Sequence, residues 1–185
     1  MATLNVTNLK HASSSSNNIV LNADGSSTIN NLGLPGHVIQ VVGGSTNTPV
    51  SEGNGTYTDT NLTASISLTN SNNKVLVLVD QSMRLSLTTA LGGGVRLLRG
   101  STVIADAHPT DSVGPAQYYI GNMVNNVDFY FRHNTHKLDT PGSGTHVYKT
   151  QIRVYNPTGN SLIFAQPGLA SSDGESNITL LEIAV

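Results

Sequence analysis

The sequence predicts an all-β protein: a jelly-roll-like antiparallel β-sandwich of about eight strands, preceded by a short extended or β-structured N-terminal arm. Three observations support this prediction. Apolar and polar residues alternate with period two wherever a pattern can be followed, and turn dipeptides separate these runs at short intervals. Glu, Lys and Gln are also too rare to cover the solvent faces of several helices.

Composition excludes several classes of function. Charged residues make up 11% of the chain and the net charge is −2, with no basic run, so we expect no nucleic-acid partner. The longest aliphatic run, Val75 to Val79, is far shorter than a membrane-spanning helix needs, so we expect no membrane insertion. Cysteine is absent, which excludes disulfides and thiolate metal sites. No motif calls for a cofactor, and none is predicted.

Residues 1–33 form the predicted arm. Ser13 to Asn18 is a polar low-complexity tract, and the flanking apolar residues are too few to make a core that folds alone. A β-competent segment without a core needs another surface to lie on. We therefore expect the arm to dock the protein onto a larger particle. Its predicted anchoring residues are Leu4, Val6, Leu9, Ile19 and Leu21.

Residues 34–185 form the predicted sandwich. Leu62, Ala64 and Ile66 alternate with hydroxyl residues, which predicts a strand with one buried face. From Val75 onward both phases begin apolar, which predicts a strand buried on both faces in its first half, with a bend near Asp80–Gln81. The eight predicted strands lie near residues 37–42, 56–69, 74–89, 94–106, 117–131, 146–155, 161–165 and 177–184.

Dipeptides and short runs typical of tight turns separate the strands. Gly and Asn tolerate the positive φ that such turns require, and Pro presets the first corner. The sequence leaves open one helical turn within residues 110–125. The turn signals are Asp24-Gly25, Asn54-Gly55, Gly92-Gly93-Gly94, Pro141-Gly142, Asn156-Pro157-Thr158-Gly159 and Asp173-Gly174.

Five stretches, taken in order, resemble the carboxy-terminal module of fibre-like virion proteins from tailed phages of marine bacteria and cyanobacteria. No single stretch is specific, but their order matches that module, and Leu4 to Ile29 is similar to the short leader of such proteins. Phe131 to Lys137 departs from the pattern because it is richer in histidine and charge. The five stretches are Leu34–Val42, Leu62–Val77, Val95–Thr102, Leu138–Ile152 and Ser176–Ile183.

The resemblance implies a phage particle protein with a jelly-roll-like fold that assembles as a homotrimer. Physical reasoning favours self-association as well, because a sandwich with few charges has little to oppose it and closed symmetry can cover exposed sheet edges. The expected partners are therefore other copies of the chain and capsid or tail proteins of the virion. A host surface glycan or protein is a further expected partner if the protein binds receptors.

Acidic pairs are candidates for glycan hydrolysis, which needs two facing carboxyl groups about 5–10 Å apart. Asp106 with Asp111, and Asp173 with Glu175, are the two candidate pairs. Both lie in polar, turn-rich stretches where Asp usually caps or turns the backbone. We therefore expect no catalytic residues and no enzyme activity.

His133, His136 and His146 are the one metal-like set in the sequence. Spaced three apart in a strand, His133 and His136 face opposite sides, although a trimer axis could gather three copies of one histidine around an ion. The favoured interpretation is that they are exposed polar histidines that bind no metal.

Tyrosines and arginines are the candidates for surface recognition. Tyr118, Tyr119 and Tyr130 could stack on sugars, and Tyr130 is out of phase with Phe129 and Phe131, so we expect it to point away from the core. A trimer contact or an ordinary surface position is the alternative for these tyrosines. Arg96 and Arg99 are expected to pair with carboxylates or to lie in the trimer interface.

The function expected from these observations is that of a non-enzymatic structural protein on the virion surface. A trimeric capsid decoration or cement protein, or a short head fibre, is favoured because the sequence encodes no long shaft. The alternative is a tail-fibre tip that recognises the host surface, and a glycan-active enzyme is a remote second alternative.

Overall fold

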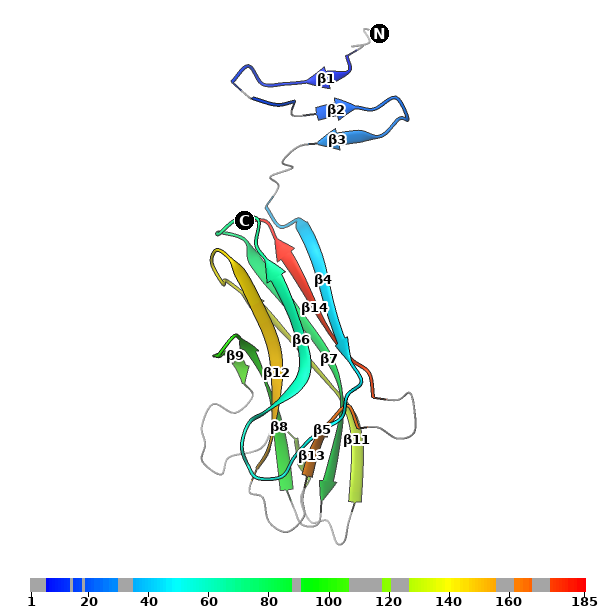
Figure 1. Ribbon diagram of the computed structural model, residues 1–185, viewed down its shortest axis with the longest axis vertical. Coiled ribbons are helices and arrows are strands. Elements are labelled where there is room, and N and C mark those ends of the chain that lie inside the picture. Colours follow the sequence, from blue (N-terminus) through cyan, green and yellow to red (C-terminus); the bar gives the residue numbers. More distant parts are fainter. Residues whose placement is uncertain are drawn as a thin grey trace. The chain divides into compact units, whose positions relative to one another are not determined.

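The computed structural model describes residues 6–13, 15–17, 19–29, 35–87, 91–106, 118–120, 127–155, 162–167 and 174–185. The chain divides into two compact units, Met1–Pro35 and Gly36–Val185. Every regular element in the described residues is a β-strand, and no helix among them could cross a membrane (Figure 1). The strands are β1 (Asn8–Leu9), β2 (Ile19–Leu21), β3 (Ser27–Ile29), β4 (Val38–Thr46), β5 (Val50–Glu52), β6 (Thr58–Ser67), β7 (Lys74–Leu87), β8 (Leu91–Arg99), β9 (Thr102–Asp106), β10 (Tyr118–Ile120), β11 (Val127–Asp139), β12 (Thr145–Tyr155), β13 (Leu162–Ala165) and β14 (Ser176–Ile183).

The second unit is a sandwich of two antiparallel sheets, which confirms the prediction of an all-β antiparallel sandwich. In the first, here the β7 sheet, β7 pairs with β11 on one side and with β14 and then β13 on the other, and these continue to β4 and β5. In the second, the β8 sheet, β8 pairs with β9 and β10 on one side and with β12 on the other. The β8 sheet ends at β6.

The core lies between the two sheets, and alternation along each strand determines which side chains enter it. In β6, Leu62, Ala64 and Ile66 are buried and the hydroxyl residues between them are exposed, as the sequence predicts. One apolar cluster combines these residues with Val75, Val77 and Val79 of β7. A second cluster lies further along β7, around Met83 and Leu85.

The long strand β7 differs from its prediction in its burial. It runs without interruption from Lys74 to Leu87, and its pairing with β11 has no register shift at Asp80–Gln81, where the sequence predicts a bend. Its first half is covered on one face only, because Leu76 is half-buried and Leu78 keeps 41% of its surface exposed. The apolar residues of its second phase therefore lie on the outer face of the sheet.

Two predicted strands each divide into two. The predicted strand 94–106 is the hairpin β8–β9, which turns at Gly100 (φ +58°). The predicted strand 117–131 corresponds to β10 and β11, and β11 continues to Asp139. The short strand β5 was missed, and most of the proposed helical turn at 110–125 lies outside the described residues.

The three consecutive glycines at 92–94 belong to strand β8 and form no turn, so that prediction is wrong. Their role is steric. A Cβ at Gly93 would lie 2.6 Å from Ile163 Cδ1, and a Cβ at Gly94 would lie 2.8 Å from Tyr155 Oη. Side chains pack directly on this backbone, so glycine is required for close packing here.

Candidate functional site

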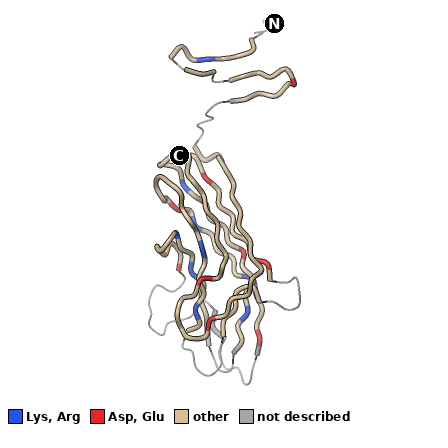
Figure 2. The backbone as a smooth tube through the Cα atoms, in the orientation of Figure 1, with Lys and Arg blue, Asp and Glu red and all other residues tan. Residues whose placement is uncertain are grey.

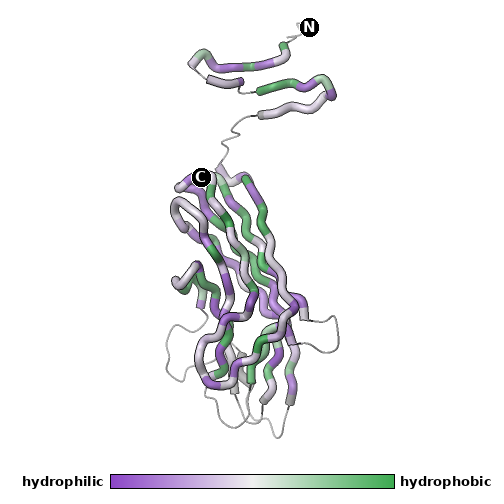
Figure 3. The backbone as a smooth tube through the Cα atoms, viewed as in Figure 1, coloured by the Kyte–Doolittle hydropathy of each residue, from purple (hydrophilic) through white to green (hydrophobic). Residues whose placement is uncertain are grey.

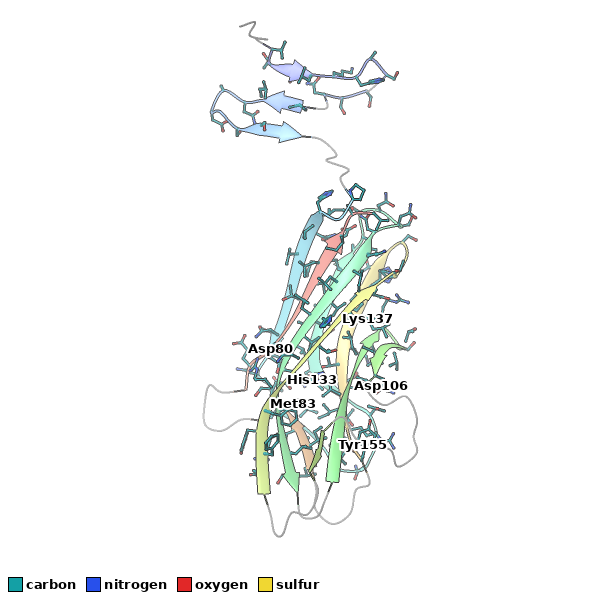
Figure 4. All side chains as sticks on the ribbon, turned by 180° about the vertical axis from the view of Figure 1, so that it is seen from behind. Asp80, Met83, Asp106, His133, Lys137 and Tyr155 are labelled. Atoms are coloured by element: carbon teal, nitrogen blue, oxygen red, sulfur yellow. The ribbon has the colours of Figure 1, made fainter. Side chains whose placement is uncertain are left out.

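A belt of buried polar side chains separates the two apolar clusters of the sandwich. In the β8 sheet the Thr60 and Thr150 hydroxyl oxygens lie 2.5 Å apart. In the β7 sheet Gln81 and His133 are buried opposite each other on β7 and β11 (Figure 4). Burial lowers the pKa of His133 to about 4, because desolvation disfavours the charged imidazolium. His133 is therefore a neutral core residue at physiological pH.

The three candidate metal ligands lie on different surfaces. His133 and His136 face opposite sides of β11, as predicted, with His133 buried and His136 exposed. The burial of His133 contradicts the expectation that all three histidines are exposed. The third, His146, has its Nε2 3.2 Å from the Gly142 carbonyl oxygen. Among the described residues, no three His, Asp or Glu side chains are grouped closely enough to hold a metal ion.

In each candidate acidic pair one carboxyl group, that of Asp111 or Asp173, lies outside the described residues. The other members of the two pairs are Asp106 and Glu175. Asp106 accepts a hydrogen bond from Tyr57 Oη (3.3 Å), and Glu175 is exposed. Tyr57 Oη also lies 3.1 Å from Tyr155 Oη. Burial and these contacts raise the pKa of the Tyr57 phenol, so this group stays protonated at neutral pH.

Two carboxylates that the sequence analysis did not single out are buried and act as structural acceptors. Glu182 accepts hydrogen bonds from Gln40 Nε2 (2.5 Å), Asn73 Nδ2 (2.6 Å) and both the amide and hydroxyl of Thr69 (2.8 Å each). Burial opposes its ionisation, but the bonds from Asn73, Gln40 and Thr69 outweigh it and lower the pKa of Glu182 to about 2. Its phase with Ile178 and Leu180 is the sequence signal that could have revealed this burial.

Glu52 plays the same part at the other end of the sandwich. Its carboxylate accepts from the backbone amides of Asn54 (2.6 Å), Thr56 (3.1 Å) and Val154 (2.6 Å). These bonds tie the segment after β5 to strand β12. Because both buried carboxylates hold neighbouring backbone in place, each has a structural role in the resting geometry.

The outer face of the β8 sheet is polar and carries a hollow of about 550 Å³. The Arg96 guanidinium lies 3.6 Å from the centroid of the Tyr57 ring, and its Nε donates to Gln151 (2.8 Å). Asp59 accepts from Lys149 and Gln151. These bonds hold the pKa of Asp59 below its usual value although burial opposes ionisation. Arg96 therefore stacks on a ring and bonds an amide, so of the two expectations, a carboxylate hydrogen-bond partner and a place in the trimer interface, the first is not met.

Arg99 has the carboxylate partner that the sequence analysis expected. Its Nη1 donates to Asp139 Oδ2 (2.7 Å), which also accepts from Tyr148 Oη (2.8 Å). Arg99 and Tyr148 belong to the β8 sheet and Asp139 ends β11 of the β7 sheet. This partly buried group therefore links the two sheets.

Tyr130 points outward from β11, as predicted, and its hydroxyl accepts from Arg84 Nη1 (3.3 Å). Arg84 also lies over the Phe164 ring, 3.8 Å from its centroid. The structure describes Tyr118 and Tyr119 as backbone of β10, and their side chains lie outside the described residues. Of the three recognition candidates, only Tyr130 is therefore placed as an exposed aromatic side chain.

A groove of about 440 Å³ lies between β9 of one sheet and β11 of the other. Val95 and Leu97 line it, together with Asp106 on β9 and Lys137 on β11 (Figure 4). Charged residues are sparse along the described backbone, in keeping with their 11% share of the sequence (Figure 2). The groove marks the long edge at which the sandwich is open.

The outer face of the β7 sheet is apolar where β4, β14, β7 and β11 lie side by side. Pairing places Val41 opposite Leu181, Leu181 opposite Leu76, and Leu76 opposite Leu138, so one apolar row crosses four strands. Val41 and Leu138 keep 61% and 50% of their surfaces exposed. Figure 3 shows the apolar residues of these strands. We call this surface the apolar outer face, formed by Val38, Val41, Leu76, Leu78, Leu138 and Leu181.

The first unit is a three-stranded antiparallel sheet, β1-β2-β3. Leu9 pairs with Ile19, and Leu21 follows two positions on, so these three predicted anchoring residues share one face. Leu9 and Leu21 are exposed, and Val6 and Ile19 are half-buried. Leu4 lies outside the described residues. No side chain among those described in this unit is buried.

No protein-family model and no curated protein matches this chain. A functional assignment therefore rests on the chemistry and geometry of its own residues. These provide two exposed apolar surfaces, buried carboxylates with structural roles, and a neutral core histidine.

Proposed function

We propose that the Gly36–Val185 unit is a jelly roll of eight strand rows. If β4 with β5, β9 with β10, and β13 with β14 are each counted as one row, the β7 sheet reads 1-8-3-6 in chain order. The β8 sheet then reads 2-7-4-5. This alternation between two four-row sheets, as in two Greek keys, is the arrangement that supports the proposal.

The function we propose is that of a non-enzymatic structural protein on the surface of a tailed-phage virion. In this proposal the protein is a homotrimeric capsid decoration or cement protein, or a short head fibre. Residues 1–33 attach it to the particle and residues 34–185 form the displayed body. The resemblance of five sequence stretches to fibre-like virion proteins is the origin of this proposal.

The observation that carries the proposal is the contrast in burial between the two units. The sandwich has two apolar clusters of its own, whereas the described residues of the N-terminal sheet bury no side chain and expose Leu9 and Leu21 on one face. Such a sheet gains little from burial within itself. Contact with a partner surface would bury this face and hold the sheet in place.

A tail-fibre tip is the second candidate, favoured by one observation. Tyr130, Arg84 and Phe164 form an exposed or half-buried aromatic and cationic surface, and such surfaces suit recognition of sugars or proteins. Competition distinguishes the candidates: a receptor-binding tip added as free protein blocks infection. A decoration protein leaves infection unchanged, and its deletion makes the capsid less stable.

Binding to phage particles that lack the protein tests the attachment claim. The double variant Leu9→Asp/Leu21→Asp places charge on the apolar face of the N-terminal sheet, and we expect it to lose binding while the sandwich melts normally. The matched control Asn8→Asp/Thr28→Asp changes the opposite face of the same sheet. Equal binding by both variants and the unchanged protein would refute attachment through this face.

A further inference from the structure

Three neighbouring strands of the β7 sheet carry nearly continuous apolar sequence. These runs are Val38–Val42 in β4, Val75–Val79 in β7 and Ile178–Ile183 in β14. Strands that are covered on both faces have this composition, whereas strands with a solvated face alternate, as β6 does. Within one chain the β8 sheet covers only the inner face. The composition therefore indicates that a second partner covers the apolar outer face.

We infer that copies of this chain pack together through the apolar outer face, around an axis that runs along the strands of the β7 sheet. This inference rests on the proposed homotrimer and names the surface by which it forms. The partner that covers the face is thus a second and a third copy of the same chain. Three features of the molecule support this packing: the zoning of the face, its area and the position where the chain enters it.

The outer face of the β7 sheet has three zones along its strands. The apolar row with Val41 and Leu138 at its two sides comes first, and the next row holds Leu78 between Thr179 and His136. A polar level follows, where Arg132 donates to both carboxylate oxygens of Asp80 (2.8 and 2.6 Å). The Arg84–Tyr130 pair lies beyond it. An axis along the strands brings each zone against the same zone of the next copy, whereas antiparallel packing would set apolar rows against ion pairs.

The whole outer face of the β7 sheet has the size that a stable interface needs. Strand β7 has 14 residues, which at about 3.3 Å per residue spans roughly 46 Å, and four strand rows about 4.8 Å apart span roughly 19 Å. The resulting area of roughly 900 Å², polar zones included, is close to the ~800 Å² that each partner buries in a standard interface, and the apolar end, where β14 pairs with β7, takes up about half of it. An apolar centre beside polar residues is also the usual anatomy of such interfaces.

The entry point of the chain agrees with parallel packing. Gly36 donates its amide to the Ala184 carbonyl (2.8 Å), which fixes the start of the sandwich at the apolar end of β4 and β14 (Figure 1). In a parallel arrangement every copy therefore begins at the same end. All N-terminal segments then leave the assembly from one side, which suits attachment to a single surface.

Light scattering of full-length variants tests this inference. Val41→Asp and Leu138→Asp place charge in the central apolar row, and we expect the mass to fall threefold, to the 19.4 kDa of one chain. The matched control is Val147→Asp, because Val147 is 44% exposed on the outer face of the β8 sheet. We expect the control to stay trimeric. Circular dichroism and thermal melting verify that each variant is folded.

The outcomes separate this inference from the proposed trimer. Trimeric Val41→Asp and Leu138→Asp alongside a trimeric unchanged protein would overturn the inference and leave the trimer intact. Dissociation of all three variants, the control included, would overturn it as well, since the effect would not be specific to this face. A monomeric unchanged protein would overturn both claims, and the apolar outer face would then need a different partner.

Discussion

At one long edge of the sandwich the two sheets touch backbone to backbone, whereas at the other they stand apart around a groove. Gly44 of β4 approaches Thr63 of β6 so closely that a Cβ would overlap with the Thr63 carbonyl oxygen. Gln40 reinforces this edge by bonding both Glu182 and the Ser67 carbonyl (2.7 Å). We call it the closed edge.

The open edge is formed by β9 and β11. Strand β11 pairs with β7 over thirteen residues and lines the groove, and it also contributes Leu138 to the apolar outer face. A long edge strand of this kind is a site for association. The chain therefore seals one edge by itself, and the surfaces suited to other copies include the other edge.

The largest expected effect is at the closed edge. Gly44→Val should destabilise folding by about 3 kcal/mol or more, because its side chain must displace the backbone of β6. Gly43→Val is the matched control, since its Cβ would meet only the Ile178 carbonyl oxygen at 3.9 Å. Urea unfolding of the two variants measures the difference. Equal stability would show that the sheets do not touch at Gly44.

Glu182 should make the closed edge sensitive to acid. Its pKa falls from 4.5 to about 2 on folding, so its stabilising effect is complete above pH 4.5 and is lost as pH falls towards 2. The loss amounts to about 3 kcal/mol. Thermal melting of Glu182→Gln between pH 5 and 2 should give a flatter profile. The control is Glu175→Gln, because Glu175 is exposed, and this variant should lose stability with falling pH as steeply as the unchanged protein. Identical profiles for the unchanged protein and both variants would contradict this role of Glu182.

His133, on strand β11 of the open edge, should make folding stability depend on pH in the range just above that of Glu182. Its folded pKa is about 4 against 6.5 for the free side chain, so the native state takes up its proton only below pH 4. Stability should therefore decrease as pH falls from 6.5 to 4, by up to about 3 kcal/mol. His133→Leu should remove that slope, whereas exposed His136→Leu should leave it. A slope that survives His133→Leu would place the titrating group elsewhere.

The smallest expected effect is at the link across the open edge. Asp139→Ala removes the shared acceptor of Arg99 and Tyr148 and should cost about 1–2 kcal/mol, since Tyr148 is buried but Arg99 is partly exposed. Asp128→Ala is the control, because its contact with Arg84 is long (3.7 Å) and exposed. A loss as large as that of Gly44→Val would mean that the open edge is as firmly joined as the closed one.

The sequence predicts strands well where one face is apolar and the other hydroxylated. In β6 the buried and exposed residues follow the alternation residue by residue, because burial on one side leaves only one acceptable register. Strand prediction from the sequence is less accurate where a glycine serves close packing and does not form a turn. Gly92–Gly94 lies in a strand because Tyr155 and Ile163 pack on its backbone, which depends on residues far along the chain.

The candidate sites were predicted less completely than the strands. Tyr130 is exposed and Arg99 is paired with a carboxylate, as expected, because each follows from local phase or charge. The burial of His133 and Glu182 depends on which sheet covers each strand, and on donors such as Asn73 that no short-range pattern specifies. The prediction that β7 is buried on both faces in its first half was wrong, because the β8 sheet covers one face and Leu76 and Leu78 lie on the outer face.

The mass of the unchanged protein in solution tests the central claim most directly. At micromolar concentration, light scattering should give a mass three times the 19.4 kDa of the chain, because the apolar outer face is then buried between copies. A single species of 19.4 kDa at the same concentration would contradict the account.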